Sequence, residues 1–148
     1  MEVYTDGSAT PDGRGGWAAI LRYGPHEKVL QGGEEEGATN NRMELKAALE
    51  ALRALKEPCE VHLYTDSEYL KKAFTEGWLS RWQKNGWKTA SGESVKNRDL
   101  WEALLREVSR HQVVFHWVQG HAGLRENERA DRLAKAARQG VIPKSTEP

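Results

Sequence analysis

The chain has 148 residues and equal numbers of basic and acidic side chains, 22 of each, so its formal net charge at pH 7 is zero. This length predicts a single domain. A charged fraction of 30% and a mean hydropathy of −0.78 exclude an integral membrane protein. The N-terminus lacks the basic and apolar regions of a signal peptide, so we expect a cytoplasmic location. Cys59 is the only cysteine, which excludes an internal disulfide and a cysteine-based zinc site.

The first part of the chain alternates apolar and polar residues in three short segments. This period of two predicts strands over residues 1–6, 17–23 and 27–33. A helix is expected over residues 39–56, because leucines and alanines recur there every three or four positions. Thr39 stands at the start of that pattern, where it can cap the helix.

The remainder predicts strands alternating with helices. The expected elements are a strand over 59–66, helices over 69–74, 78–84 and 97–109, a strand over 111–120 and a helix over 126–138. This order describes an α/β domain with a mixed five-stranded sheet, in which the first, fourth and fifth strands are parallel and helices cover the faces. We expect one domain over 1–139 and a disordered tail over 140–148, which contains two prolines and no periodic pattern of apolar residues.

Two of the predicted strands end in nearly the same sequence motif, and each copy contains an aspartate. The motifs YTDGS and YTDSE place Asp6 and Asp66 at strand ends, so neighbouring strands would bring the two carboxylates together. Glu44 lies near the start of the long helix, and Asp131 lies on the last helix. Four converging carboxylates repel one another unless cations bridge them. Oxygen ligands without cysteine or histidine suit Mg²⁺ or Mn²⁺.

Each of these acids also has an ordinary structural interpretation. An aspartate before glycine or serine is commonly a turn former or a helix cap, which applies to Asp6 and Asp66. Glu44 taken alone is typical of a solvated helix residue. The pattern by itself leaves the metal site and these structural roles open.

Several motifs share the order and spacing of one family. They are TDGS at 5–8, TNNRMEL at 39–45, YTDS at 64–67, VKNRDLW at 95–101, VQGHAG at 118–123 and ENERAD at 126–131. On these motifs the chain resembles bacterial type 1 ribonuclease H over residues 2–139. The resemblance implies the ribonuclease H fold, with strand order 3-2-1-4-5, an antiparallel second strand and a basic handle region.

The resemblance also implies an activity and a set of catalytic residues. The activity is metal-dependent endonucleolytic hydrolysis of the RNA strand of an RNA/DNA hybrid, giving 5′-phosphate and 3′-hydroxyl ends, with roles in replication and repair. It implies two Mg²⁺ ions in the substrate complex, for which Mn²⁺ can substitute. The implied metal-binding and catalytic carboxylates are Asp6, Glu44, Asp66 and Asp131. His121 resembles the mobile histidine that assists proton transfer or product release, although alone it is typical of a plain loop histidine.

Substrate contacts follow from the same resemblance. Asn40, Asn41 and Glu68 are expected at the RNA strand, whereas Thr39 and Asn97 are expected at a phosphate of the DNA strand. Thr39 has the simpler alternative of a helix N-cap. Two positions depart from the family pattern, since Glu68 replaces a glutamine or histidine of some relatives and the loop over 9–14 has an unusual sequence.

The segment from 71 to 101 is basic and rich in tryptophan. It holds seven basic and three acidic residues and four of the six tryptophans. Helical spacing favours core packing of these rings, whereas the basic neighbours favour nucleic-acid binding. The segment resembles the family's handle, which implies DNA-strand contacts by Trp78, Trp82, Lys84, Lys88 and Trp101.

Three other functions compete with the hybrid ribonuclease. The same fold and metals act on DNA in transposases and integrases. A non-catalytic module would keep the binding groove without the chemistry. A generic α/β domain would use the acids only as caps, which leaves the paired strand ends and the basic tryptophan segment unexplained. We expect a monomer whose partner is an RNA/DNA hybrid and not a membrane.

Overall fold

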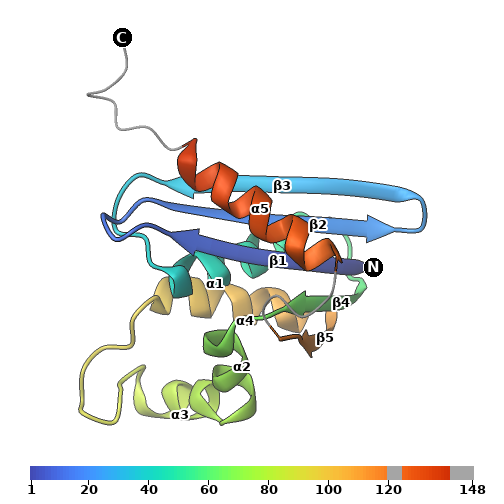
Figure 1. Ribbon diagram of the computed structural model, residues 1–148. Helices are drawn as coiled ribbons and strands as arrows, with labels where there is room; N and C mark the ends of the chain where they lie inside the picture. The colour runs from blue at the N-terminus through green and yellow to red at the C-terminus, as the bar shows by residue number, and fades with distance from the viewer. Residues whose placement is uncertain (120–124, 141–148) are drawn as a thin grey trace.

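Figure 1 shows a computed structural model of the chain, in which residues 1–119 and 125–140 are described. One five-stranded sheet has the order β3-β2-β1-β4-β5. Its strands are β1 (Glu2–Ala9), β2 (Gly15–Tyr23), β3 (His26–Glu34), β4 (Glu60–Thr65) and β5 (Gln112–Trp117). The helices are α1 (Asn40–Arg53), α2 (Glu68–Thr75), α3 (Trp78–Asn85), α4 (Arg98–Arg110) and α5 (Arg125–Gln139).

The sheet topology confirms the predicted strand order. β1, β2 and β3 pair antiparallel, because short connections join them. β1 pairs parallel to β4, and β4 pairs parallel to β5, because helices cross over between these strands. The mixed five-stranded sheet is therefore the one expected from the sequence.

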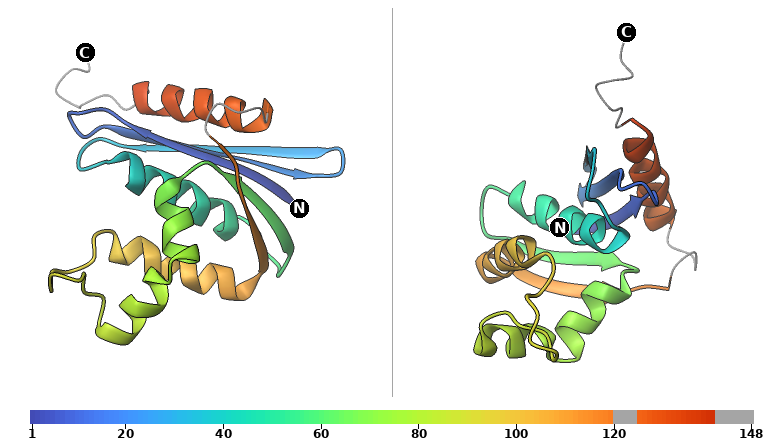
Figure 2. Two further views of the ribbon diagram at one scale, coloured as in Figure 1. Left: turned by 60° about the horizontal axis from the view of Figure 1, so that its bottom comes forward. Right: turned by 90° about the vertical axis from the view of Figure 1, so that its left-hand side faces the viewer.

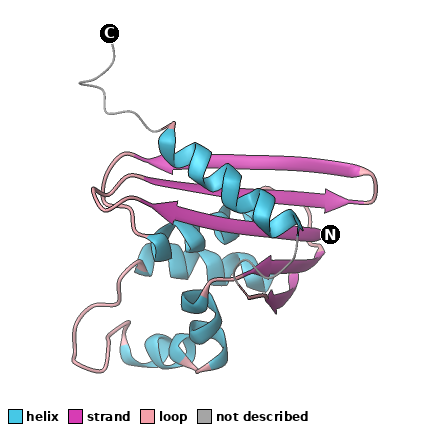
Figure 3. Ribbon diagram, in the orientation of Figure 1, coloured by secondary structure: helices cyan, strands magenta, loops and turns pink. Residues whose placement is uncertain are grey.

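Helices cover the two faces of the sheet unequally. α5 lies across β1, β2 and β3 on one face, while α1 lies against the other face with α4 beside it (Figures 1 and 2). α2 and α3 extend below the sheet and carry the long loop that leads into α4 (Figure 3). The main core lies between the sheet and α1, and its fully buried side chains include Val3, Leu49, Leu63, Trp101 and Leu104. None of the helices in the described part of the chain is long and apolar enough to cross a membrane.

Three predicted ends differ from the structure by three residues. β1 continues to Ala9 because it still pairs with β2 beyond Asp6, which is opposite Ala18. α1 ends at Arg53, earlier than expected. β5 ends at Trp117, where its pairing with Thr65 of β4 also ends. The expected tail lies mostly outside the described residues, so the domain boundary at 139 remains a prediction, although α5 ends there.

Candidate active site

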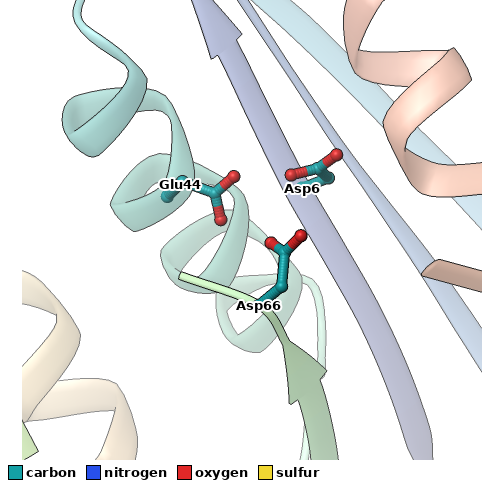
Figure 4. A group of neighbouring side chains, drawn as sticks. All are labelled: Asp6, Glu44 and Asp66. Atoms are coloured by element: carbon teal, nitrogen blue, oxygen red, sulfur yellow. The ribbon is translucent and has the colours of Figure 1, made fainter. Parts of the chain in front are cut away.

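Parallel pairing places the two repeated motifs in the same register. Tyr4 pairs with Tyr64, and this is the last paired position of β1 and β4. Asp6 and Asp66 each follow two residues later, where β4 has ended and β1 continues alone with β2. The predicted convergence at a strand end thus holds for β4, but Asp6 lies within its strand. The Asp66 carboxylate points from the end of β4 toward β1, where Asp6 and Glu44 lie (Figure 4).

Gly7 allows α1 to bring a third carboxylate to the same place. A Cβ atom on Gly7 would lie 2.3 Å from the backbone nitrogen of Glu44, so only glycine permits this approach of helix and strand. The Gly7 N–H donates to Glu44 Oε1 and to Asp6 Oδ1, both at 2.9 Å. One backbone N–H therefore holds two carboxylates together.

The three acids form a tight and largely buried cluster. One oxygen each from Asp6, Glu44 and Asp66 lies within 4.8 Å of the others. Asp6 and Glu44 are each only 7% exposed. Burial, with contributions from the carboxyls of Asp131 and Asp66, raises the pKa of Asp6 to about 6. Burial followed by the neighbouring Asp6 and Asp66 raises the pKa of Glu44 well above its ordinary value.

Asp131 approaches the cluster from the opposite face of the sheet. It lies on α5 and interacts with the Asp6 carboxyl closely enough to raise the pKa of Asp6. Its Oδ2 also accepts an ion pair from Lys135 Nζ at 3.1 Å. The structure therefore brings all four predicted carboxylates to one region.

These residues have the properties of a divalent cation site. All four supply carboxylate oxygens, the ligand type preferred by Mg²⁺ and Mn²⁺. The raised pKa values of Asp6 and Glu44 show that the cluster disfavours its own negative charge. A cation would offset that repulsion, because it takes the place that protons otherwise fill.

The start of α1 borders this cluster. The Thr39 hydroxyl caps the helix by accepting from the Arg42 N–H at 3.0 Å, which confirms its capping role. The Ala9 N–H donates to Asn40 Oδ1 at 2.7 Å, so this side chain also joins α1 to the end of β1. Asn41 is exposed beside them. Three polar side chains thus surround a helix N-terminus at the edge of the carboxylate cluster.

Asn97 lies at the start of α4 and is linked to α1 through Arg42. The Arg42 Nη1 donates to Asn97 Oδ1 at 3.3 Å, and the Asn97 Nδ2 donates to Tyr69 Oη at 3.4 Å. A guanidinium can only donate, so the Asn97 amide must turn its oxygen toward Arg42. Asn97 also has a positive φ of 60°, a conformation that asparagine tolerates.

The expected DNA contact by Trp101 is wrong. Its side chain is 0% exposed, and its Nε1 donates to Tyr69 Oη at 2.9 Å inside the core. Helical spacing placed this ring on the inner face of α4, where Trp82 packs 5.8 Å away. Trp101 therefore supports the handle from within and offers no surface to a nucleic acid.

The handle presents the other expected residues at its surface. Trp78 and Trp82 are half-buried, with ring centroids 5.8 Å apart. Both line a hollow of about 340 Å³ together with Lys88, while Lys84 lies exposed on the same helix as the two rings. The two tryptophans thus pack against the core and keep an open side, so both predicted roles are compatible with their positions.

Two predicted residues remain to be placed. Glu68 is exposed at the first position of α2, directly after the Ser67 cap, where a negative charge also favours the helix dipole. His121 lies outside the described residues.

Comparison with known proteins identifies the family. The family model described as RNase H matches residues 1–139. The chain belongs to the ribonuclease H family. It is 64% identical over 136 residues to a ribonuclease H of Thermus thermophilus, covering 91% of this chain and 81% of that protein. It is 58% identical to a ribonuclease H of Chelativorans sp. strain BNC1, covering 97% of this chain and 86% of that protein. These relatives identify a bacterial type 1 ribonuclease H, and hence a nuclease.

Solved structures agree with the fold. The crystal structure of LC9-RNase H1, a type 1 enzyme with the type 2 active-site motif, has a TM-score of 0.80 at 33% identity, covering 97% of this chain and 74% of that chain. A foamy viral protease-reverse transcriptase in complex with an RNA/DNA hybrid has a TM-score of 0.72 at 20% identity, covering 95% of this chain and 20% of that chain. The second likeness concerns the fold alone.

Sequence patterns did not reveal several residues that build the site. Gly7 could have been noticed only because it follows Asp6 within the repeated motif. Arg42 and Tyr69 join elements that are distant in sequence, and nothing in their local pattern distinguishes them from surface or core residues. Their positions depend on how α1, α2 and α4 pack together.

Proposed function

We propose that this ribonuclease H cuts the RNA strand of RNA/DNA hybrids at the Asp6, Glu44 and Asp66 cluster, with Mg²⁺ as its cofactor. The observation that carries the proposal is the approach of three carboxylate oxygens to within 4.8 Å in a chain of this family. Asp131 completes the ligand set from α5. The products are 5′-phosphate and 3′-hydroxyl ends.

The carboxylates act by holding and orienting the reacting groups. When bound, two divalent cations would activate a water and stabilise the leaving 3′ oxygen. Gly7 orients Glu44 and Asp6 through its N–H, which keeps the two carboxylates side by side. Lys135 pairs with Asp131 and can release it to a cation. His121 is the candidate for moving a proton or assisting product release.

The polar start of α1 and the handle are proposed to hold the two strands. Asn40 and Asn41 stand next to the carboxylates, where short side chains suit the 2′-hydroxyls of RNA, and exposed Glu68 borders the same strand. Thr39 and Asn97, which both bond to Arg42, are proposed to bind a phosphate of the DNA strand. The DNA strand then continues over Trp78, Trp82, Lys84 and Lys88.

The test is cleavage of one labelled RNA strand, presented alone, paired with RNA or paired with DNA. We expect cutting only in the hybrid, only with Mg²⁺ or Mn²⁺, and none with EDTA. Glu44→Gln should abolish cutting while hybrid binding remains. Glu50→Gln changes a half-buried carboxyl that pairs with Arg53 on the same helix, so it is the matched control and should cut normally.

Three outcomes would contradict the proposal. Normal cutting by Glu44→Gln would remove the carboxylate cluster from the mechanism. Equal cutting after a 2′-deoxy substitution at the scissile position would instead favour the DNA-directed enzymes of this fold. Tight hybrid binding without any cutting would favour a non-catalytic module.

The cellular assignments rest on the same activity. Hydrolysis of hybrids suits removal of RNA primers and hybrids during replication and repair, which take place in the bacterial cytoplasm. We propose that the chain acts as a monomer through the domain over 1–139. Light scattering of the free protein and of its hybrid complex tests the oligomeric state.

A further inference from the structure

A pair of histidines lies on the face of β4 and β5 that the described helices leave uncovered. α5 lies over β1, β2 and β3 and reaches β4 at Tyr64, whose backbone oxygen accepts from Asn127, and α1 and α4 lie on the other face (Figure 2). Val114 on the open face is 46% exposed, and the His62 side chain beside it is 36% exposed. His116 follows two residues after Val114 on the same face of β5.

The two imidazoles approach each other closely. His62 Nδ1 lies 2.9 Å from His116 Nε2. Two nitrogens bound to one tetrahedral Zn²⁺ at 2.0–2.1 Å lie about 3.3 Å apart. The present distance between the two nitrogens is within a few tenths of an ångström of that value. The half-exposed His62 ring can turn outward and lengthen this distance.

Neighbouring groups already set the orientation that a metal ligand needs. Glu60 Oε1 lies 3.3 Å from His62 Nε2. A carboxylate only accepts, so the His62 proton belongs on Nε2 and the Nδ1 lone pair faces His116. In many metal sites the ring nitrogen that does not bind the metal donates its N–H to a carboxylate, which fixes the orientation of the histidine. The Tyr64 ring stacks on His116 at 4.4 Å and 13°, which holds that imidazole in place.

We propose that His62 Nδ1 and His116 Nε2 form a binding site for a borderline transition cation such as Zn²⁺. Water completes the coordination on the open side. The cation takes the position of the proton between the two nitrogens, and this proton moves from His116 Nε2 to His116 Nδ1 as the ring changes tautomer, so no net proton is released. Imidazole nitrogen selects Zn²⁺, Ni²⁺ or Cu²⁺ over Mg²⁺. This site therefore differs in ligand chemistry from the carboxylate cluster, and it links β4 to β5.

The test is a Zn²⁺ titration followed by calorimetry and thermal unfolding at pH 7.5 in excess Mg²⁺, which occupies the carboxylates. Ligand binding to the folded state should raise Tm by about 3 °C or more for each tenfold of free Zn²⁺ above Kd. We expect His62→Gln and His116→Gln each to weaken Zn²⁺ binding at least tenfold and to lose most of this rise. Glu60→Gln should weaken binding less, because Glu60 acts through His62.

The controls separate this site from other zinc ligands. His26→Gln changes an exposed histidine at the start of β3 and should keep the full response. Cys59→Ser and Asp6→Asn should also keep it, because neither residue belongs to the pair. Metal-free unfolding of each variant supplies its own reference Tm. Unchanged Zn²⁺ affinity in His62→Gln and His116→Gln, or its loss in Cys59→Ser or Asp6→Asn, would overturn the proposal.

Discussion

Replacing Asp6 by asparagine should stabilise the metal-free protein while it removes the proposed activity. Asp6 is 7% exposed, and its pKa is about 6 in the folded chain against an ordinary 3.8. A tenfold change in proton affinity corresponds to about 1.4 kcal/mol, so this difference represents at most about 3 kcal/mol of destabilisation above pH 6. The amide oxygen introduced by Asp6→Asn would keep the acceptor for the Gly7 N–H without the charge. We expect a gain of about 1–3 kcal/mol at pH 7.

The pH dependence gives the sign of this effect. Between pH 4 and 6 the unfolded chain has lost the Asp6 proton, whereas the folded chain still holds it. The folded state then binds more protons, so its stability falls as pH rises through this window. Asp6→Asn lacks this contribution. The two proteins should therefore have similar stability near pH 4 and differ most above pH 6.

Urea unfolding in EDTA from pH 4 to 8 measures this difference. Added Mg²⁺ should stabilise the wild type more than Asp6→Asn and so reduce the gap. Asp12→Asn is the matched control, because that exposed carboxyl has a lowered pKa, chiefly through Thr10, and should yield no gain. Equal or lower stability of folded Asp6→Asn at pH 7 in EDTA would refute the electrostatic argument.

Four further predictions concern packing and substrate binding. Gly7→Ala should lower the free energy of unfolding by about 1–3 kcal/mol or more and reduce activity, because a Cβ there meets the α1 backbone at 2.3 Å. Tyr69→Phe should cost about 1–3 kcal/mol, since it leaves the buried Trp101 N–H without its acceptor, and chemical denaturation measures the loss. Arg42→Met should raise KM for the hybrid with little change in kcat, because the Asn97 amide loses the donor that orients it. Lys88→Gln should weaken binding and lower the salt dependence by about one phosphate contact.

These predictions have their own controls. Gly24→Asn changes a glycine with open space around it and a φ of 57°, so its stability should change little. Glu34→Gln removes an ion-pair partner of Arg42 but keeps the Asn97 bond, and its KM should stay near the wild-type value. Lys56→Gln alters an exposed charge distant from the handle. A KM that rises equally in Glu34→Gln and Arg42→Met would contradict the orienting role of Arg42.

The sequence by itself determined the features that depend on local chemistry. Alternation predicted the strands, leucine spacing predicted α1, and the Thr39 cap stands where the pattern placed it. The repeated motif also predicted that Asp6 and Asp66 meet. Each aspartate lies two residues after a tyrosine, and Tyr4 and Tyr64 are paired in parallel strands, so the two aspartates reach the same level. Glu44 and Asp131 were candidates from their positions on predicted helices, and the family motifs then assigned them to the same set as Asp6 and Asp66.

The tertiary structure alone decided which side chains face each other across elements. Helical spacing put Trp78 and Trp82 on one face of a helix, but it could not tell that Trp101 is buried while those two rings stay half-buried. The pairing of His62 with His116 needs the register of β4 on β5, and the orientation of Asn97 needs Arg42 from α1. β1 extends beyond its predicted end to Ala9, because it still pairs with β2 after its pairing with β4 has ended. Such features come from non-local contacts, whose partners a periodic pattern along the chain does not specify.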